Sequence, residues 1–193
     1  MDTYALESLL AGATETPRIE YKASAPWSTD LYAKDILALT NTDDGGYIIV
    51  GVEDKTLART GVSAEHAQTY VSDLMRDAMS RFADPYVQFS THKIVGADGL
   101  TYVAIRVEAF DDVPVICRID NVPAGVDKGR LYIRTKTRRP ESALISTHSE
   151  MRELIERASV RMMQRYHRLG LRPRDEIQQD SDAEALQKEL GDL

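Results

Sequence analysis

Four acidic residues flank two segments that we expect to be strands, and their type and spacing suggest metal chemistry. Glu15 and Glu20 stand around the first segment, and Glu53-Asp54 ends the apolar segment 47–52. Carboxylates at the ends of neighbouring strands can converge, and Mg²⁺ or Mn²⁺ prefers such oxygen clusters. An ion held there would polarise a phosphoryl oxygen and activate water for phosphodiester cleavage. The same spacing also fits surface carboxylates, with Glu20 paired to a neighbouring base.

Basic residues gather in two places where a phosphate backbone could bind. Lys22 follows Glu20 by two residues and therefore shares its strand face. Every second residue from 130 to 136 shares a face in the same way, which sets cations beside the ring of Tyr132. Such a row suits a sugar-phosphate backbone, but it is also typical of a solvated edge strand. The residues that we expect to contact phosphate are Lys22, Arg130, Arg134, Lys136, Arg138 and Arg139.

A row of arginines follows one face of a long helix expected over residues 147–169. Like charges at this spacing repel mildly, so the row implies that anions lie nearby. Nucleic acid, acids of the same fold or the acidic residues 175–193 would each serve. The row consists of Arg157, Arg161, Arg165, Arg168 and Arg172. The adjacent apolar face, which we expect in the core, consists of Met151, Ile155, Ala158, Met162 and Tyr166.

Other site chemistries lack their patterns in this sequence. The turn Asn41–Gly46 follows a helix and lacks the order of a phosphate loop, so we expect no nucleotide cofactor. We interpret Asn41 as a hydrogen-bonding residue at a helix end. The histidines show no metal-ligand spacing, and no motif indicates a nucleophilic serine or cysteine.

Hydrophobic periodicity predicts helices and strands without a strict βαβ rhythm. The class is therefore α+β, with a mixed or antiparallel sheet flanked by helices and a long C-terminal helix. The expected helices cover residues 2–11, 30–42, 64–82 and 147–169. The expected strands cover residues 18–23, 47–52, 86–95, 101–109, 113–119 and 130–134.

Length and charge divide the chain unevenly. Its 193 residues carry a net charge of −7. Residues 175–193 contain seven acids and one base, so they carry −6 and the rest carries −1. We therefore predict a domain over residues 1–173 and an acidic, flexible tail over 174–193. The sequence shows neither a signal peptide nor an apolar run that could span a membrane, and its single cysteine, Cys117, fits a reducing cytoplasm.

Three stretches resemble the Schlafen AlbA-type family. Residues 15–22 resemble its opening E-S-x-x-x-E-F-K signature, and residues 34–54 its diagnostic helix, A-N-T-x-G-G turn and G-V-x-D strand. Pro114-Val115 and residues 130–134 resemble its later P-V and Y-x-R strands. The resemblance runs from about residue 4 to 169. Thr40 departs from the usual alanine, and residues 135–137 depart from a glycine-serine turn.

The resemblance implies an activity and a set of site residues. Animal Schlafen proteins use this domain as a metal-dependent endoribonuclease on transfer and ribosomal RNA. Glu15, Glu20 and Asp54 occupy the positions of its three catalytic acids, which hold Mg²⁺ or Mn²⁺. We therefore expect a metal-dependent endoribonuclease that acts on structured RNA such as tRNA, with RNA favoured over DNA as partner. The animal nuclease has two related lobes, so one copy here predicts a homodimer or higher homo-oligomer.

Two alternatives remain open. Many stand-alone microbial members of the family are described as DNA-binding or regulatory, so the chain could be a non-catalytic DNA-binding regulator. It could also be an interaction subunit of a larger assembly, such as an antiviral defence complex, that docks through its last helix or its acidic tail.

Overall fold

Four strands from separate parts of the chain form the central sheet of the protein, a computed structural model that describes residues 1–11, 16–54, 56–137 and 139–171. Their order across the sheet is β1-β2-β5-β4, with β1 and β2 parallel and the other neighbours antiparallel. The strands are β1 (Ile19–Lys22), β2 (Gly46–Val50), β4 (Phe89–Val95) and β5 (Thr101–Val107). This mixed sheet and its helices confirm the α+β class.

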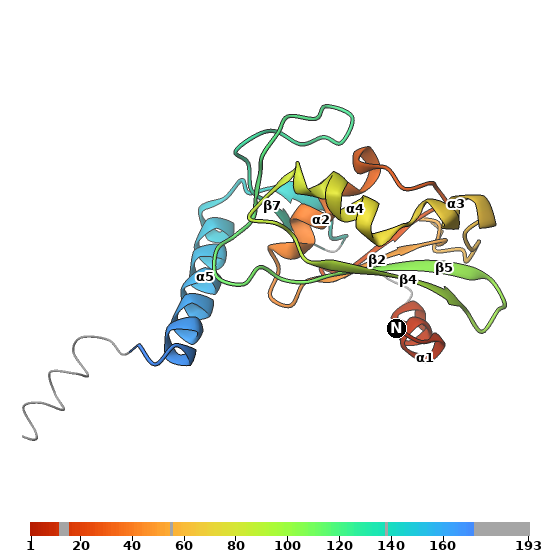
Figure 1. Cartoon of the computed structure of the whole chain (residues 1–193), viewed down its shortest axis with the longest axis horizontal. Helices are drawn as coiled ribbons and strands as arrows, with labels where there is room; N and C mark the ends of the chain where they lie inside the picture. The colour runs from red at the N-terminus through yellow and green to blue at the C-terminus, as the bar shows by residue number, and fades with distance from the viewer. Residues whose placement is uncertain (12–15, 55, 138, 172–193) are drawn as a thin grey trace, which may run out of the picture.

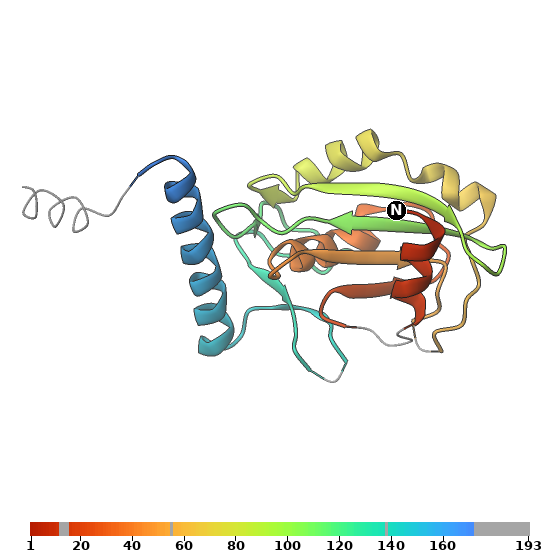
Figure 2. The same cartoon turned by 90° about the horizontal axis from the view of Figure 1, so that it is seen from below.

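Helices cover both faces of the sheet (Figures 1 and 2). The helices are α1 (Thr3–Ala11), α2 (Thr29–Thr40), α3 (Ala64–Thr69), α4 (Ser72–Ser80) and α5 (His148–Arg168). The single helix expected over residues 64–82 is wrong, because Tyr70 leaves helical geometry and divides it into α3 and α4. The Tyr70 ring is buried against Tyr32, and its hydroxyl donates to the carbonyl of Ala25 at 2.8 Å.

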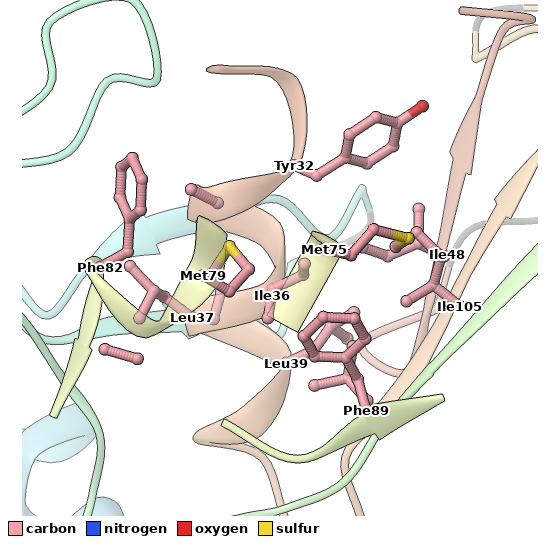
Figure 3. Close-up of a cluster of buried hydrophobic side chains, with 14 of the residues drawn as sticks. Tyr32, Ile36, Leu37, Leu39, Ile48, Met75, Met79, Phe82, Phe89 and Ile105 are labelled. Carbon is pink, nitrogen blue, oxygen red and sulfur yellow. The ribbon is translucent and has the colours of Figure 1, made fainter. Parts of the chain in front are cut away.

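Alternation along the strands divides the core into two layers. Ile48 and Val50 of β2 face α2 and α4, whereas Ile49 between them faces α1. The first layer is the larger, and Figure 3 shows Ile36 and Leu39 of α2 beside the methionines of α4. Successive side chains of a strand point to opposite faces, so both faces of the sheet are buried, one under α2 and α4 and the other under α1.

Two short ribbons lie outside the main sheet. They pair β3 (Ala83–Asp84) with β6 (Ile116–Cys117), and β7 (Tyr132–Arg134) with β8 (Ser142–Leu144). The strands expected over 113–119 and 130–134 are therefore shorter than predicted, and β8 was not expected. The β7–β8 ribbon matters for function because it contacts α2 beside β1.

Helix α5 stands at one end of the molecule (Figures 1 and 2). Thr147 and Glu150 form a capping box that fixes its start. Leu154 is its only buried side chain. Ala158 packs against the core as expected, but the expectation that Met151, Ile155 and Tyr166 belong to the core is wrong. Within the described ranges, no helix is long and apolar enough to cross a bilayer. Residues 174–193 lie outside those ranges, so the domain boundary at 173 stays a prediction.

Candidate nucleic-acid interface

Charged residues from three segments and a serine from a fourth meet where β1, α2 and the β7–β8 ribbon join. Glu20 and Lys22 share a face of β1, and the Nζ of Lys22 lies 2.7 Å from Oε1 of Glu20. The same Nζ lies 2.8 Å from Oδ2 of Asp35 on α2. Arg134 of β7 donates from Nη1 to Oε2 of Glu20 at 2.6 Å, and the hydroxyl of Ser142 donates to Oδ1 of Asp35 at 2.5 Å. We call these five residues the junction network.

The junction network is closely balanced in charge and largely removed from water. Glu20 and Asp35 are buried, and the side chain of Arg134 is 0% exposed. Burial alone would lower the pKa of the Lys22 amine, but Asp35 and Glu20 together outweigh burial and raise that pKa above its ordinary value. Lys22 therefore stays charged at any physiological pH. The main role of these two cations and two carboxylates is structural, because their ion pairs hold β1, α2 and β7 together.

Arg134 has no surface to offer a ligand. Beyond Glu20, its guanidinium donates to the hydroxyl of Ser142 at 3.2 Å and to the carbonyl of Pro140 at 3.2 Å. We expected Arg134 to contact phosphate, and the structure places it beneath the surface. The predicted row of cations on one strand face does not form, because β7 ends at Arg134 and buries Tyr132 as well.

The remaining predicted cations lie apart from one another. Lys136 forms an ion pair with Glu153 of α5, with 2.6 Å between Nζ and Oε2. Arg130 is exposed in the turn before β7, and Arg139 is exposed before β8. Arg138 and the predicted metal ligand Glu15 lie outside the described residues.

An open pocket of about 380 Å³ lies over the junction network. Five residues predicted from the sequence line it, and they come from β1, the loop after β2, and the β7–β8 ribbon: Glu20, Lys22, Asp54, Arg134 and Arg139. Lys34 of α2 also lines the pocket, and sequence reasoning missed it. The available signal was its position beside Asp35 in the family's diagnostic block. Lys34 and Arg139 form no ion pair with any described residue, so both remain available to an anion.

The carboxylates that line the pocket decide whether it can hold a divalent cation. Within the described part of the chain, no three acidic, histidine or cysteine residues form a group that could hold a metal ion. The two carboxylate oxygens of Glu20 face Lys22 and Arg134. Asp54 is exposed and pairs with no described residue. These residues do not fit a metal ion as they are arranged here.

The arginine row of α5 pairs with acids and carbonyls of the same fold. Arg157 forms an ion pair with Asp43 and donates to the carbonyl of Asn41 at 2.7 Å. Arg161 donates to the carbonyls of Asp43 and Phe110, and Arg165 pairs with Asp112. The expected alternatives were nucleic acid, acids of the same fold and residues 175–193. Acids and carbonyls of the fold itself are the partners of Arg157, Arg161 and Arg165. Arg172 lies beyond the described residues.

The glycine-rich turn between α2 and β2 is a structural joint. The side chain of Asn41, at the end of α2, donates to the carbonyls of Val115 and Tyr132, each at 2.9 Å. Its Oδ1 accepts from the backbone N–H of Val115 at 2.9 Å. A Cβ added at Gly45 would lie 2.0 Å from the Val107 carbonyl oxygen, so only glycine fits there. The residues of the A-N-T, P-V and Y-x-R motifs are therefore partners of one another.

The comparisons with known proteins identify the family. The family described as Schlafen, AlbA_2 matches residues 15–141. That match spans well over half of the chain, which therefore belongs to the Schlafen AlbA_2 family.

Solved structures show a distant likeness. The DIP2311 protein from Corynebacterium diphtheriae is 21% identical, with a TM-score of 0.48 over 72% of this chain and 25% of that one. The chain thus spans about a quarter of that protein's length. The N-terminal domain of a putative ATP-dependent DNA helicase RecG-related protein from Nitrosomonas europaea is 18% identical, with a TM-score of 0.43, covering 77% of this chain and 97% of that one. No curated protein matches the chain.

Proposed function

We propose that this Schlafen AlbA_2 chain binds nucleic acid, with structured RNA such as tRNA as the leading ligand, at the pocket over the junction network. The observation that carries the proposal is the set of cations around that pocket. Lys22, Lys34 and Arg139 come from three separate segments and line one opening. Phosphate oxygens are the acceptors that such cations prefer, and phosphate contacts position a protein on a polynucleotide. The preference for RNA rests on the resemblance to animal Schlafen proteins.

The strength of this binding follows from which cations are free. Lys22 already neutralises Glu20 and Asp35 together with Arg134, so its attraction for phosphate is reduced. Lys34 and Arg139 carry the main electrostatic contact, and the carboxylates of Asp54 and Glu141 at the pocket weaken it. Two phosphate contacts give a slope of about −2 in a plot of log affinity against log salt concentration. We therefore expect modest, salt-sensitive binding.

The test is fluorescence anisotropy with a labelled tRNA and a DNA hairpin of equal length, in the presence of a chelator. Lys34→Ala and Arg139→Ala should each weaken binding by about threefold to tenfold. Lys93→Ala is the matched control, because Lys93 is exposed on β4, at the opposite edge of the sheet from β1. Unchanged affinity in both pocket variants would refute the site. Tighter binding to DNA would favour the DNA-binding regulator.

RNA cleavage with Mg²⁺ or Mn²⁺ is the second candidate function, favoured by one observation. Glu20 and Asp54, two of the three predicted metal ligands, line the same pocket although Glu20 lies in β1 and Asp54 follows β2. Cleavage at this site would require Glu15 as well and would require Glu20 to leave at least one of its cations. Incubation of tRNA with the chain and Mn²⁺ tests this. Cleavage that disappears in Asp54→Asn supports the site, and cleavage that persists in this variant removes it.

A further inference from the structure

Several large hydrophobic side chains of α5 and its C-cap are exposed, among charged ones such as Arg152 and Glu156. Large hydrophobic side chains that are 38% to 63% exposed follow its length: Met151, Ile155, Val160, Met163, Tyr166 and Leu169. Proteins rarely expose so many large apolar side chains to water unless these side chains form a binding surface. Figures 1 and 2 show α5 at the end of the molecule, with one side toward the body and the other away from it.

The side of α5 that docks on the body is a different one. Leu154 is buried there, and Arg157, Arg161 and Arg165 reach acids and carbonyls of the body. The exposed residues Ile155, Tyr166 and Leu169 lie on the neighbouring side of the helix. Together with Ser159 and Met162 they follow one another at intervals of three or four residues. Spacing of this kind forms a continuous stripe along a helix and is typical of helix–helix seams. We call residues 155, 159, 162, 166 and 169 the α5 stripe.

We infer that the α5 stripe pairs with the α5 stripe of a second copy of this chain, and that the two helices run antiparallel. The middle of the stripe favours a second copy, because residues 155 to 166 are self-complementary, with Leu169 left beside Arg152 at each end of the seam. A twofold axis between Ser159 and Met162 sets the small Ser159 opposite the large Met162 of the other copy. The same axis sets Ile155 opposite Tyr166. Alternation of small and large side chains across a seam lets two helices interdigitate.

The charges of α5 favour the antiparallel arrangement. Its three acids, Glu150, Glu153 and Glu156, lie in the first half together with Arg152 and Arg157, whereas all charged residues of the second half are bases. A parallel pair would set the two wholly basic halves side by side and would align the two helix dipoles. An antiparallel pair sets each basic half beside the half that holds the acids and opposes the dipoles.

The size of α5 limits the affinity. A helix of 21 residues is roughly 32 Å long, and one such seam buries less than a standard protein interface. The dimer should therefore form with a dissociation constant on the order of 10 micromolar. Its formation would bring two pockets into one particle, although the inference does not depend on what the pockets bind.

Sedimentation velocity on the full chain, from about 1 to about 200 micromolar, tests the association. We expect a shift from monomer to dimer across this range. Ile155→Glu and Tyr166→Glu should each weaken the dimer by about 100-fold, because each change enters the seam twice. Leu74→Glu is the matched control, since Leu74 is 64% exposed on α4, and it should leave the dimer intact. A chain that stays monomeric throughout, or a dimer that both stripe variants leave unchanged, would overturn the inference.

Cysteine cross-linking tests the direction of the helices. The only native cysteine, Cys117, is buried, and burial raises the pKa of its thiol, so its background reactivity is low. Ser159→Cys, near the axis, should form a disulfide-linked dimer under mild oxidation. Leu169→Cys should not cross-link with itself but should do so in a mixture with Arg152→Cys. Efficient cross-linking of Leu169→Cys with itself would show parallel helices and overturn the antiparallel arrangement.

Discussion

Two groups of cations in this protein look alike in the sequence and behave differently in the structure. The junction network holds the buried Arg134 and the partly exposed Lys22 against Glu20 and Asp35. The arginines of α5 hold the helix against the body at its edge. The difference is access to water: the side chain of Arg134 is 0% exposed, whereas those of Arg157 and Arg165 are 15% and 55% exposed.

This difference sets how much each group contributes to stability. A buried charge that loses its partner has no water to replace it, so the loss is large. An exposed charge that loses its partner is solvated at once, and the loss is small. We therefore expect the junction network to contribute strongly to the stability of the whole fold, whereas the α5 arginines only hold one helix in position. The variants below test this contrast.

Arg134→Ala should have the largest effect. It leaves Glu20 buried with Lys22 as its only cation and removes the donors to Ser142 and Pro140. We expect a loss of about 4 kcal/mol in the free energy of unfolding, measured by urea denaturation. Lys136→Ala is the control, because Lys136 is an exposed cation two residues away, and it should lose less than about 1 kcal/mol. Equal losses in the two variants would contradict the contrast.

Asn41→Ala should have the next largest effect, because Asn41 is buried and bonds both to the core and to α5. Its side chain satisfies buried backbone groups of Val115 and Tyr132, and its own carbonyl accepts from Arg157 of α5. The substitution removes the first set of hydrogen bonds and keeps the last. We expect a loss of about 3 kcal/mol in unfolding free energy. Amide exchange should show this loss across the sheet, since the core unfolds as a unit.

Local patterns in the sequence were enough to predict much of the fold. Helix α2 and strand β2 lie within two residues of their expected ends, because helical periodicity and a glycine pair are local signals. The turn between β4 and β5 falls between the strands expected over 86–95 and 101–109. The division of α3 from α4 depends instead on a tertiary contact of Tyr70, which periodicity does not contain.

The candidate site was predicted only in part, because its meaning depends on partners far along the chain. Residue types indicated which side chains carry charge, and five of them do line one pocket. Spacing does not show whether a cation faces solvent, and the partner of Arg134 lies 114 residues away. Lys34 was missed because its one signal, a position beside Asp35 in the family's diagnostic block, does not show which way a helical lysine faces. The apolar side of α5 was assigned to the core because periodicity shows a face but not what covers it.

Arg157→Ala should have a smaller effect that is confined to one element. Arg157 pairs with the exposed Asp43 and donates to the carbonyl of Asn41, so water can replace the lost contacts. We expect a loss of about 1 kcal/mol. Amide exchange should speed up along α5 and stay unchanged in β2 and β5. High salt, at about 1 M, should mimic the variant in the wild-type chain. Faster exchange throughout the sheet would show that α5 contributes to the core after all.

The smallest effect should come from acidification at the start of α5. The backbone N–H of Ser146 lowers the pKa of the Glu150 carboxyl below its ordinary value of 4.5, and the N–H of Thr147 adds to this against the opposing effect of burial. Because the pKa is lowered in the folded state, the stabilisation is complete above pH 4.5 and is lost as the pH falls through the folded-state pKa. Amide exchange at the first turn of α5 should therefore accelerate below pH 4.5. Glu150→Gln keeps both capping hydrogen bonds without a titrating group, so its first turn should show no such pH dependence beyond intrinsic exchange. If amide exchange at the first turn accelerates below pH 4.5 in the Gln variant as well, a carboxylate other than Glu150 stabilises the start of α5.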